Sequence, residues 1–110
     1  MLFASLFATI KNEEMKKYEL IDNERDMCYE FHVDGEIAKI DYMKTRDGGI
    51  ALTHTEVPYT LQGQGIGHAL VEACLEEIDR QGKKVVPLCG FVHGYIQENP
   101  QWKRIVMEGY

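Results

Sequence analysis

The sequence predicts a single α/β domain: four antiparallel strands, a glycine-rich turn, a long helix, a parallel fifth strand and a C-terminal helix. Three observations support this fold class. The first half has short stretches of alternating apolar and polar residues, separated by turn residues; apolar residues then recur at helical spacing; and a β-branched run follows that helix. The 110 residues, 45% hydrophobic and 27% charged, suit one globular core, so residues 1–110 are expected to form one domain.

The first half of the chain has the pattern of an antiparallel meander. Asp34-Gly35 is a two-residue hairpin turn between the second and third strands. Asp47-Gly48-Gly49 turns the chain into the fourth strand, which Pro58 ends because proline lacks a backbone donor. The four strands are expected at residues 18–22, 27–33, 36–42 and 50–57.

The second half changes to helical periodicity. A helix is expected from about Gly65 to Gln81, followed by Gly82 as a C-terminal stop. The fifth strand, residues 84–89, should run parallel to the fourth because a helix connects them. Pro87 cannot donate to a neighbouring strand, so these two strands should separate there and leave a cleft. The remaining expected elements are a helix at 91–97 and a helical turn within 101–110.

Composition argues against several function classes. The 18 acidic residues outnumber the 12 basic ones, and a net charge of −6 opposes nucleic-acid binding and suits an amine substrate. Cys28, Cys74 and Cys89 lie far apart and form no C-x-x-C pair. We therefore expect neither a disulfide framework nor a metal site, and a reducing cytoplasm fits best.

The first 17 residues form an extension of uncertain role. Residues 1–10 are apolar but lack a basic region and a cleavage site, and they are too short to span a bilayer. We expect neither a signal peptide nor a membrane anchor. The alternatives are a helix that covers a surface or a second copy of the chain, and a disordered start. The apolar residues at helical spacing are Leu2, Phe3, Leu6, Phe7 and Ile10.

The most informative motif, Gln62-Gly63-Gln64-Gly65-Ile66-Gly67, lies between the fourth strand and the helix. Glycines let a backbone approach a ligand closely, and the first N–H groups of a helix are free donors at its positive end. No Asp or Glu occurs between Val57 and Glu72, so the motif predicts a site for an external anion. The spacing is not the G-x-G-x-x-G of dinucleotide folds, and the G-K-[ST] of a P-loop is absent.

This motif, in its context, resembles the GNAT superfamily of acetyl-coenzyme A-dependent N-acetyltransferases. Gln62, Gly65 and Gly67 match the superfamily signature Q/R-x-x-G-x-G/A. Three further segments look like those of small stand-alone GNAT-type proteins: residues 54–57, residues 85–89 and residues 99–102. The resemblance covers about residues 18–106. It implies a GNAT-like fold, acetyl-coenzyme A as cosubstrate, and transfer of acetyl to an amine of a small molecule or protein.

The resemblance also implies which residues hold the coenzyme. Backbone N–H groups of the glycine turn would bind its pyrophosphate, and its pantetheine would lie between the fourth and fifth strands. The end of the fourth strand would donate to the thioester carbonyl and stabilise the oxyanion that forms there. His68 would either touch the coenzyme or face solvent. The expected coenzyme-binding residues are Thr55, Val57, Gln62, Gly63, Gln64, Gly65, Ile66, Gly67 and His68.

Transfer to an amine also needs a base, because a primary amine near neutral pH is mostly ammonium. His54 is the first candidate, since it lies on the strand beside the expected cleft and histidine titrates near neutral pH. The alternative is a histidine on a sheet face, bonded to a backbone carbonyl. Glu56 lies on the same side as His54 in a regular strand, and would orient it, act as the base, or be a solvated carboxylate.

Two further residues are catalytic candidates. The resemblance points to His54 and Cys89 as a pair in which the thiolate takes the acetyl group, although cysteine is commonly a small buried hydrophobe. Tyr95 would protonate the departing coenzyme thiolate, or else pack in the core. Direct transfer is our preferred hypothesis. A non-catalytic acyl-coenzyme A-binding module and an interaction protein are the alternatives.

Overall fold

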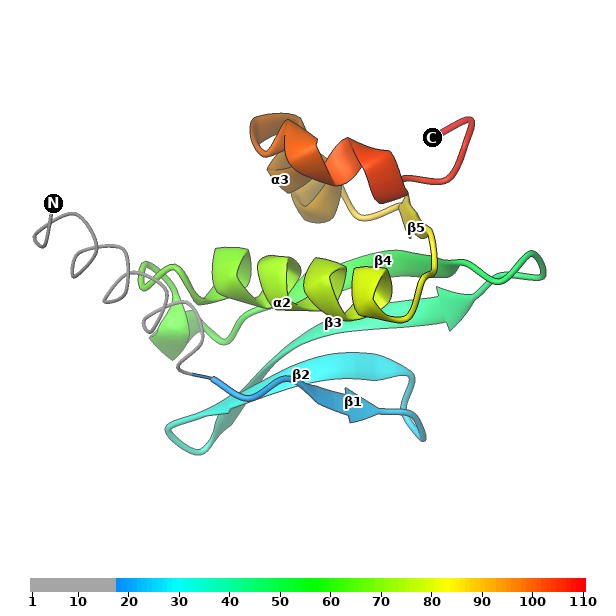
Figure 1. Cartoon of the computed structure of the whole chain (residues 1–110). Coiled ribbons are helices and arrows are strands. Elements are labelled where there is room, and N and C mark those ends of the chain that lie inside the picture. The colour runs from blue at the N-terminus through cyan, green and yellow to red at the C-terminus, as the bar shows by residue number, and fades with distance from the viewer. Residues whose placement is uncertain (1–17) are drawn as a thin grey trace, which may run out of the picture.

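The computed structural model describes residues 18–110, so the helix considered for residues 1–10 lies outside the described residues. Figure 1 shows a twisted sheet with α2 lying along it and α3 beside α2. The elements are β1 Ile21–Asn23, β2 Cys28–Val33, β3 Glu36–Lys44, β4 Ile50–Glu56, η1 Tyr59–Leu61, α2 Ile66–Arg80, β5 Val85–Pro87, α3 Gly90–Glu98 and η2 Pro100–Ile105.

The sheet has the strand order β1-β2-β3-β4-β5, with antiparallel pairing up to β4 and a parallel β4–β5 pair. This confirms the predicted fold class. The β2–β3 turn has positive φ at Asp34 (51°) and Gly35 (79°), the backbone of the expected two-residue hairpin. The first strand was placed too early: β1 covers only Ile21–Asn23, because these are the residues with partners on β2.

A register shift interrupts the β3–β4 pair. Tyr42 pairs with Leu52, but the preceding residue of β3, Asp41, pairs with His54. Thr53 is therefore an extra residue on β4, and its hydroxyl donates to the Asp41 carbonyl at 3.3 Å. Such a bulge changes which side chains share a face of the strand.

Helix α2 covers one face of the sheet. Its buried side chains pack in one cluster with Tyr29, Ile40 and Leu52. Each fully buried side chain of this kind contributes about 1.5–3 kcal/mol of transfer free energy. The buried residues of α2 are Ile66, Leu70, Val71, Cys74, Leu75 and Ile78.

The opposite face is largely polar, and we call it the open face. Alternation and the β-strand register place on it Glu30, His32, Lys39, Asp41, Met43, Ala51, His54, Glu56 and Val86. Ala51 and Val86 are buried but do not belong to the α2 cluster, in agreement with this placement.

The β4–β5 pair ends where Pro87 was expected to end it. The last paired residues are Leu52 and Pro87, and the N–H groups of Leu88 and Cys89 then both donate to the Leu52 carbonyl, at 3.0 and 2.9 Å. Beyond this point, β4 continues to Glu56 without a partner on β5. The structure thus confirms the predicted separation of the two strands.

Glu72 of α2 ties the C-terminal elements to the core. Its Oε1 accepts hydrogen bonds from the Tyr95 hydroxyl at 2.5 Å and from Trp102 Nε1 at 2.8 Å. Arg104 of η2 forms an ion pair with Asp79 of α2 at 2.6 Å. No helix between residues 18 and 110 is both long and apolar enough to cross a membrane.

Candidate active site

The glycine turn forms the wall of a cavity of about 400 Å³ at the N-terminus of α2. Gly63 and Gly65 have φ values of 81° and 76°, and Gly65 is the N-cap residue. A Cβ added at either would meet nothing within 4 Å, so both backbones face open space. The first turn of α2 has no acidic residue. The lining residues are Thr55, Val57, Leu61, Gln62, Gly63, Gly65, Ile66, Gly67, His68 and Phe91.

The two glutamines of the motif differ in position. Gln62 lines the cavity, and its Nε2 donates to the Val57 carbonyl at 3.2 Å, which holds the turn against the end of β4. Gln64 does not line the cavity, because its Nε2 points back to the Thr60 carbonyl at 3.4 Å. Eight of the nine expected coenzyme-binding residues thus line one cavity, and Gln64 alone does not.

Phe91 forms another wall of the cavity. Its ring stacks on His68 with centroids 5.3 Å apart, and it lies against Gly67, where an added Cβ would be 3.0 Å from Phe91 Cζ. The sequence predicts only that Phe91 begins the helix expected at 91–97. Its position one residue after the start of α3 is the feature that could have indicated its place in the cavity wall, because the start of α3 lies across from the glycine turn.

Cys89 lies next to this cavity, at the N-cap of α3. Its Sγ is 3.3 Å from the hydroxyl of Thr55, which lines the cavity. Burial disfavours the thiolate, but hydrogen bonds from the Thr55 hydroxyl and from the backbone N–H groups of Val92, Phe91 and Thr55 outweigh it and lower the Cys89 pKa. The start of α3 and the end of β4 therefore make a place that stabilises negative charge.

His54 and Glu56 lie on the open face, whereas Thr55 between them faces Cys89. Both are exposed. Within the described part of the chain, no contact joins His54 to Cys89, so the structure does not bring the expected pair together. The bulge at Thr53 is the physical reason, because it reverses the alternation of β4 before His54.

Tyr95 is buried in the core cluster, 9% exposed. Burial is the first cause that raises its pKa, and the hydrogen bond that its hydroxyl donates to Glu72 is the second. Its ring lies 5.8 Å from that of His68. Tyr95 therefore does not line the cavity: its ring packs in the core and its hydroxyl is bonded to Glu72.

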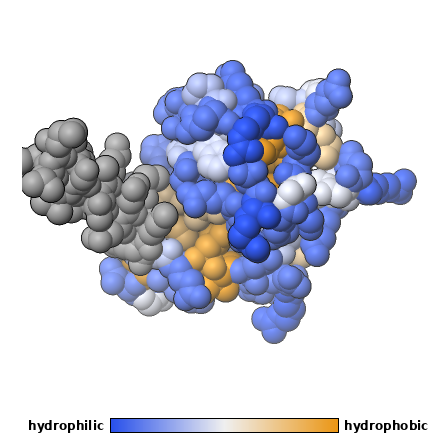
Figure 2. All heavy atoms as spheres, viewed as in Figure 1, coloured by the Kyte–Doolittle hydropathy of each residue, from blue (hydrophilic) through white to orange (hydrophobic). Residues whose placement is uncertain are grey.

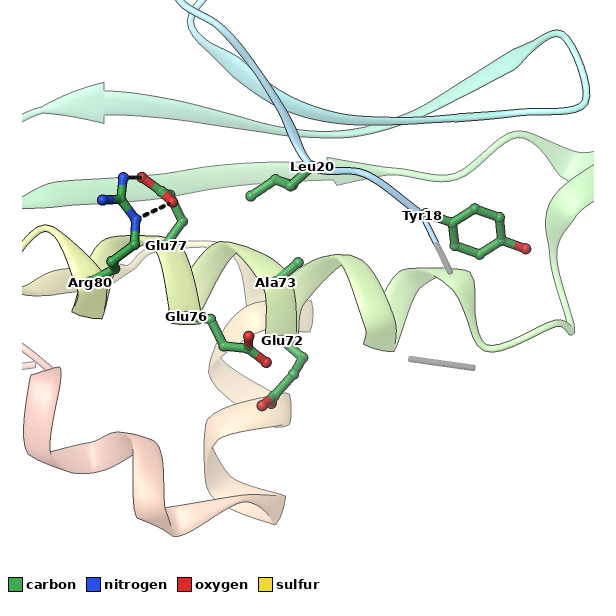
Figure 3. Close-up of a pocket in the computed structure, with 7 residues that line it drawn as sticks. All are labelled: Tyr18, Leu20, Glu72, Ala73, Glu76, Glu77 and Arg80. Carbon is green, nitrogen blue, oxygen red and sulfur yellow. Dashed lines mark hydrogen bonds and ion pairs between the residues drawn. The ribbon is translucent and has the colours of Figure 1, made fainter. Parts of the chain in front are cut away.

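Two other features lie outside this site. A second cavity, of about 440 Å³, lies between α2 and the chain before β1 (Figure 3). Its charged lining includes Glu77, which is bound to Arg80 on the same helix. Figure 2 shows apolar surface amid hydrophilic residues near the start of the described chain. The apolar residues of the cavity are Tyr18, Leu20 and Ala73.

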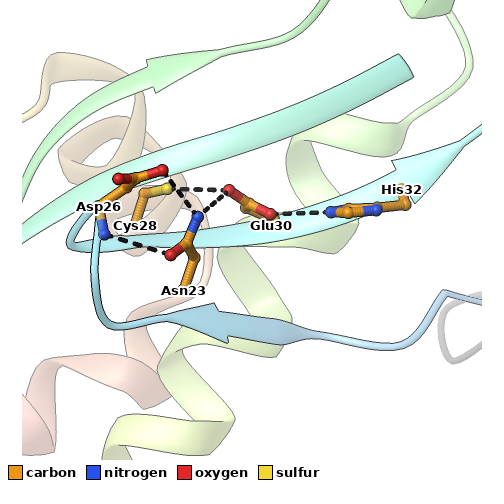
Figure 4. Close-up of polar contacts among 5 residues, drawn as sticks. All are labelled: Asn23, Asp26, Cys28, Glu30 and His32. Carbon is orange, nitrogen blue, oxygen red and sulfur yellow. Dashed lines mark hydrogen bonds and ion pairs between the residues drawn. The ribbon is translucent and has the colours of Figure 1, made fainter. Parts of the chain in front are cut away.

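The other feature is a polar network at the β1–β2 edge of the open face (Figure 4). The Glu30 carboxylate, 9% exposed, accepts hydrogen bonds from His32 at 2.8 Å, Asn23 at 2.9 Å and Cys28 at 3.2 Å. The bonds from His32 and then Asn23 are the largest causes that lower its pKa to about 2. No group of His, Cys, Asp and Glu in residues 18–110 has the arrangement to hold a metal ion.

Comparison with known proteins identifies the family. The family model of GCN5-related N-acetyl-transferases matches residues 28–105, well over half of the 110 residues. The chain belongs to this family. The match includes the glycine turn, Thr55 and Cys89, and acetyl transfer is the general activity of the family.

The similarity to individual curated proteins covers a shorter part of the chain than the family model does. It is 35% identical over 51 residues to protein NATD1 of Gallus gallus, which is 46% of each chain. Protein NATD1 of Homo sapiens is also 35% identical over 51 residues, 46% of this chain and 45% of that protein. For the Xenopus tropicalis protein the identity is 33%, over 46% of this chain and 47% of that protein. The match thus spans about half the length of these relatives.

Proposed function

We propose that this protein is an N-acetyltransferase that moves acetyl from acetyl-coenzyme A directly to an amine. One observation carries the proposal: a single cavity runs from the glycine turn at the α2 N-terminus to Thr55, whose side chain contacts Cys89 beyond the end of the β4–β5 pair. The places that we assign to the pyrophosphate and to the thioester carbonyl thus belong to one cavity.

The residues present fit the coenzyme. The N-terminus of α2 has free N–H donors, the positive end of a helix dipole and no acidic residue, all of which favour a pyrophosphate. Gly63 and Gly65 keep side-chain atoms out of that space. Phe91 and Val57 supply apolar walls for the pantetheine, and the end of β4, which has no partner on its β5 side, supplies backbone hydrogen bonds.

The donors around Cys89 suit the charge that develops during acyl transfer. When an amine nitrogen attacks the thioester carbonyl, the carbonyl oxygen becomes an oxyanion, and one preorganised donor is worth about 3 kcal/mol in acyl-transfer enzymes. The Thr55 hydroxyl and the N–H groups near Cys89 already converge on a single sulfur. We assign the N–H groups at this end of β4 to the oxyanion, and Cys89 to the lining of the site.

His54 is the assigned base, acting from the open face. The ammonium form of the acceptor loses one proton to the imidazole before attack. The N–C bond then forms as the C–S bond breaks, and the second proton of the nitrogen passes to the coenzyme thiolate. His54 returns its proton to solvent, which its exposure allows. Glu56, exposed on the same face, attracts the ammonium group.

The experiment is calorimetric titration of coenzyme A and acetyl-coenzyme A, followed by an acceptor screen that measures release of coenzyme A. If the protein is an acetyltransferase, it should bind both compounds and release coenzyme A only when a suitable amine is present. Binding without release for any amine would instead favour a non-catalytic acyl-coenzyme A-binding module. His54 is exposed and lies away from Cys89, so the expected catalytic pair is not assembled, and this observation favours the binding module as the second candidate. Binding of neither compound would contradict both.

A further inference from the structure

A groove of about 420 Å³ lies on the open face, and it shares no lining residue with the coenzyme cavity. Part of its wall is apolar and exposed: Met43 and Leu88 are each 57% exposed and Tyr110 is 64% exposed, and apolar side chains that gather in one exposed patch mark a binding surface. Ala51 and Val86, both buried and outside the α2 cluster, belong to the same lining.

The groove adjoins the transfer site from the opposite face of the sheet. Leu88 is the residue before Cys89, and the N–H groups of both donate to the Leu52 carbonyl, where the two strands separate. Ala51 and His54 share the open face because of the Thr53 bulge. His54 lies three positions beyond Ala51, so an occupant that extends past the groove toward the strand separation reaches it.

The two ends of the groove differ in charge. Beyond the groove, toward the strand separation, the open face carries His54 beside its cross-strand partner Asp41. Glu56 follows beside its partner Lys39, which also forms an ion pair with Asp41 at 3.4 Å, so two carboxylates face one lysine there. At the other end, Lys44 and Arg46 line the groove, and neither has an ion-pair partner among residues 18–110. The Asp47 carboxylate at this end accepts a hydrogen bond from Thr45 at 2.5 Å.

We propose that this groove binds the acceptor, and that the acceptor is a primary amine on an apolar stem with a carboxylate at its far end. The proposal rests on the acetyltransferase function above and names its substrate class. The amine lies at His54 and Glu56, the stem lies on Leu88, Met43 and their apolar neighbours, and the carboxylate meets Lys44 and Arg46. Lys44 pairs with Ile50, which lies four residues before His54 on β4. A strand rises about 3.3 Å per residue and the bulge takes up one residue, so the stem that connects the two ends spans roughly 10–13 Å.

The test is direct binding of 4-aminobutanoate, 6-aminohexanoate and 8-aminooctanoate to the full chain by calorimetry, with and without coenzyme A. Each added methylene should tighten binding by up to about 4-fold while it buries more stem. Leu88→Asp should weaken 8-aminooctanoate by at least about 10-fold, since a carboxylate replaces apolar contact. Leu88 is largely exposed, so this variant should fold.

The carboxylate end has its own control. The double variant Lys44→Gln, Arg46→Gln should weaken 8-aminooctanoate several-fold and leave octylamine unchanged, because octylamine lacks the carboxylate. Arg25→Gln is the matched control, because it removes an exposed charge on the β1–β2 turn. Strands β2 and β3 separate β1 from β4 in the sheet, so this variant should change the affinity for neither 8-aminooctanoate nor octylamine.

Three results would overturn the proposal. They are no binding of any of the three amino acids, an affinity independent of chain length, and an affinity unaffected by Leu88→Asp. The proposed function fails differently, through absence of coenzyme A binding or of coenzyme A release with every amine. That result would also remove the assignment of the groove to an acceptor. The two failures differ in the calorimetry without coenzyme A, because the amino acids still bind when only the acetyltransferase function fails.

Discussion

Thr55 and Cys89 are 34 positions apart in the sequence, and their side chains meet with Oγ1 and Sγ 3.3 Å apart. The contact joins the free end of β4 to the start of α3, beside the cavity at the glycine turn. It also concentrates hydrogen-bond donors on one sulfur. The local chemistry of the site should therefore be measurable through the Cys89 thiol, whatever its role in turnover.

Replacing Thr55 should make the Cys89 thiol less acidic. Thr55→Val keeps the side-chain shape but removes the hydroxyl that lowers the Cys89 pKa, so the pH midpoint of alkylation should move upward. Iodoacetamide labelling followed by mass spectrometry would report this site. Burial raises the pKa of Cys28 to about 12 and that of Cys74 well above its usual value, so neither should compete. An unchanged midpoint would mean that the hydroxyl does not stabilise the thiolate.

Single substitutions of His54 and Cys89 separate direct transfer from a covalent acetyl-cysteine. Under direct transfer, Cys89→Ala should keep substantial activity, whereas His54→Ala should lose roughly 10²- to 10⁴-fold with partial recovery at alkaline pH. A nucleophile and its base act as a unit, so a covalent route predicts near-complete loss in both. Acetyl-Cys89 that forms and decays at the rate of turnover, seen by intact-mass spectrometry, would contradict direct transfer.

The sequence predicted the strand order, the hairpin turn and the end of the β4–β5 pair, because each follows from local chemistry. Asp34-Gly35 requires positive φ, and Pro87 lacks a donor wherever it occurs. The position of His54 could not be predicted in this way. Alternation from Leu52 places His54 on the α2 face, and only the bulge at Thr53, which depends on pairing with β3, moves it to the open face.

The coenzyme cavity was predictable only in part, namely where local chemistry determines its wall. A glycine turn before a helix creates its donors locally, so Gly63 and Gly65 were found from the motif alone. Phe91 becomes a wall only when α3 packs beside α2 and its ring meets His68. The Tyr95 hydroxyl is likewise held by Glu72, 23 positions away in sequence, a tertiary contact that no local pattern indicates.

Gly65→Asp should reduce affinity for coenzyme A by roughly 10- to 100-fold, the range expected when hydrogen bonds to a charged group are lost. The new carboxylate would occupy the open space at the α2 N-terminus and repel the pyrophosphate. Gly48→Asp is the matched control, because Gly48 also has positive φ (83°) and open space around it. Calorimetry that shows equal affinity for both folded variants would contradict the phosphate assignment.

Gly67→Ala should act through Phe91. The added Cβ would lie 3.0 Å from Phe91 Cζ and push the ring, which is 42% exposed and free to move, into the cavity. Affinity for coenzyme A should therefore fall while the melting temperature changes little. In the Phe91→Ala background the same substitution should have no further effect on affinity. Additive losses in the double variant would show that Gly67 acts independently of Phe91.

Glu30 should make the fold sensitive to acid. Its pKa falls from the ordinary 4.5 to about 2 in the folded protein, which corresponds to on the order of 3 kcal/mol. Because the folded pKa is the lower one, this stabilisation is complete above about pH 5 and is lost as the pH falls toward 2. Glu30→Gln should be less stable than wild type at pH 7, and the difference should shrink with acidification. Urea unfolding at a series of pH values measures this, with the exposed Glu98→Gln as control. A constant difference between Glu30→Gln and wild type across this range would show that the Glu30 carboxylate is not responsible.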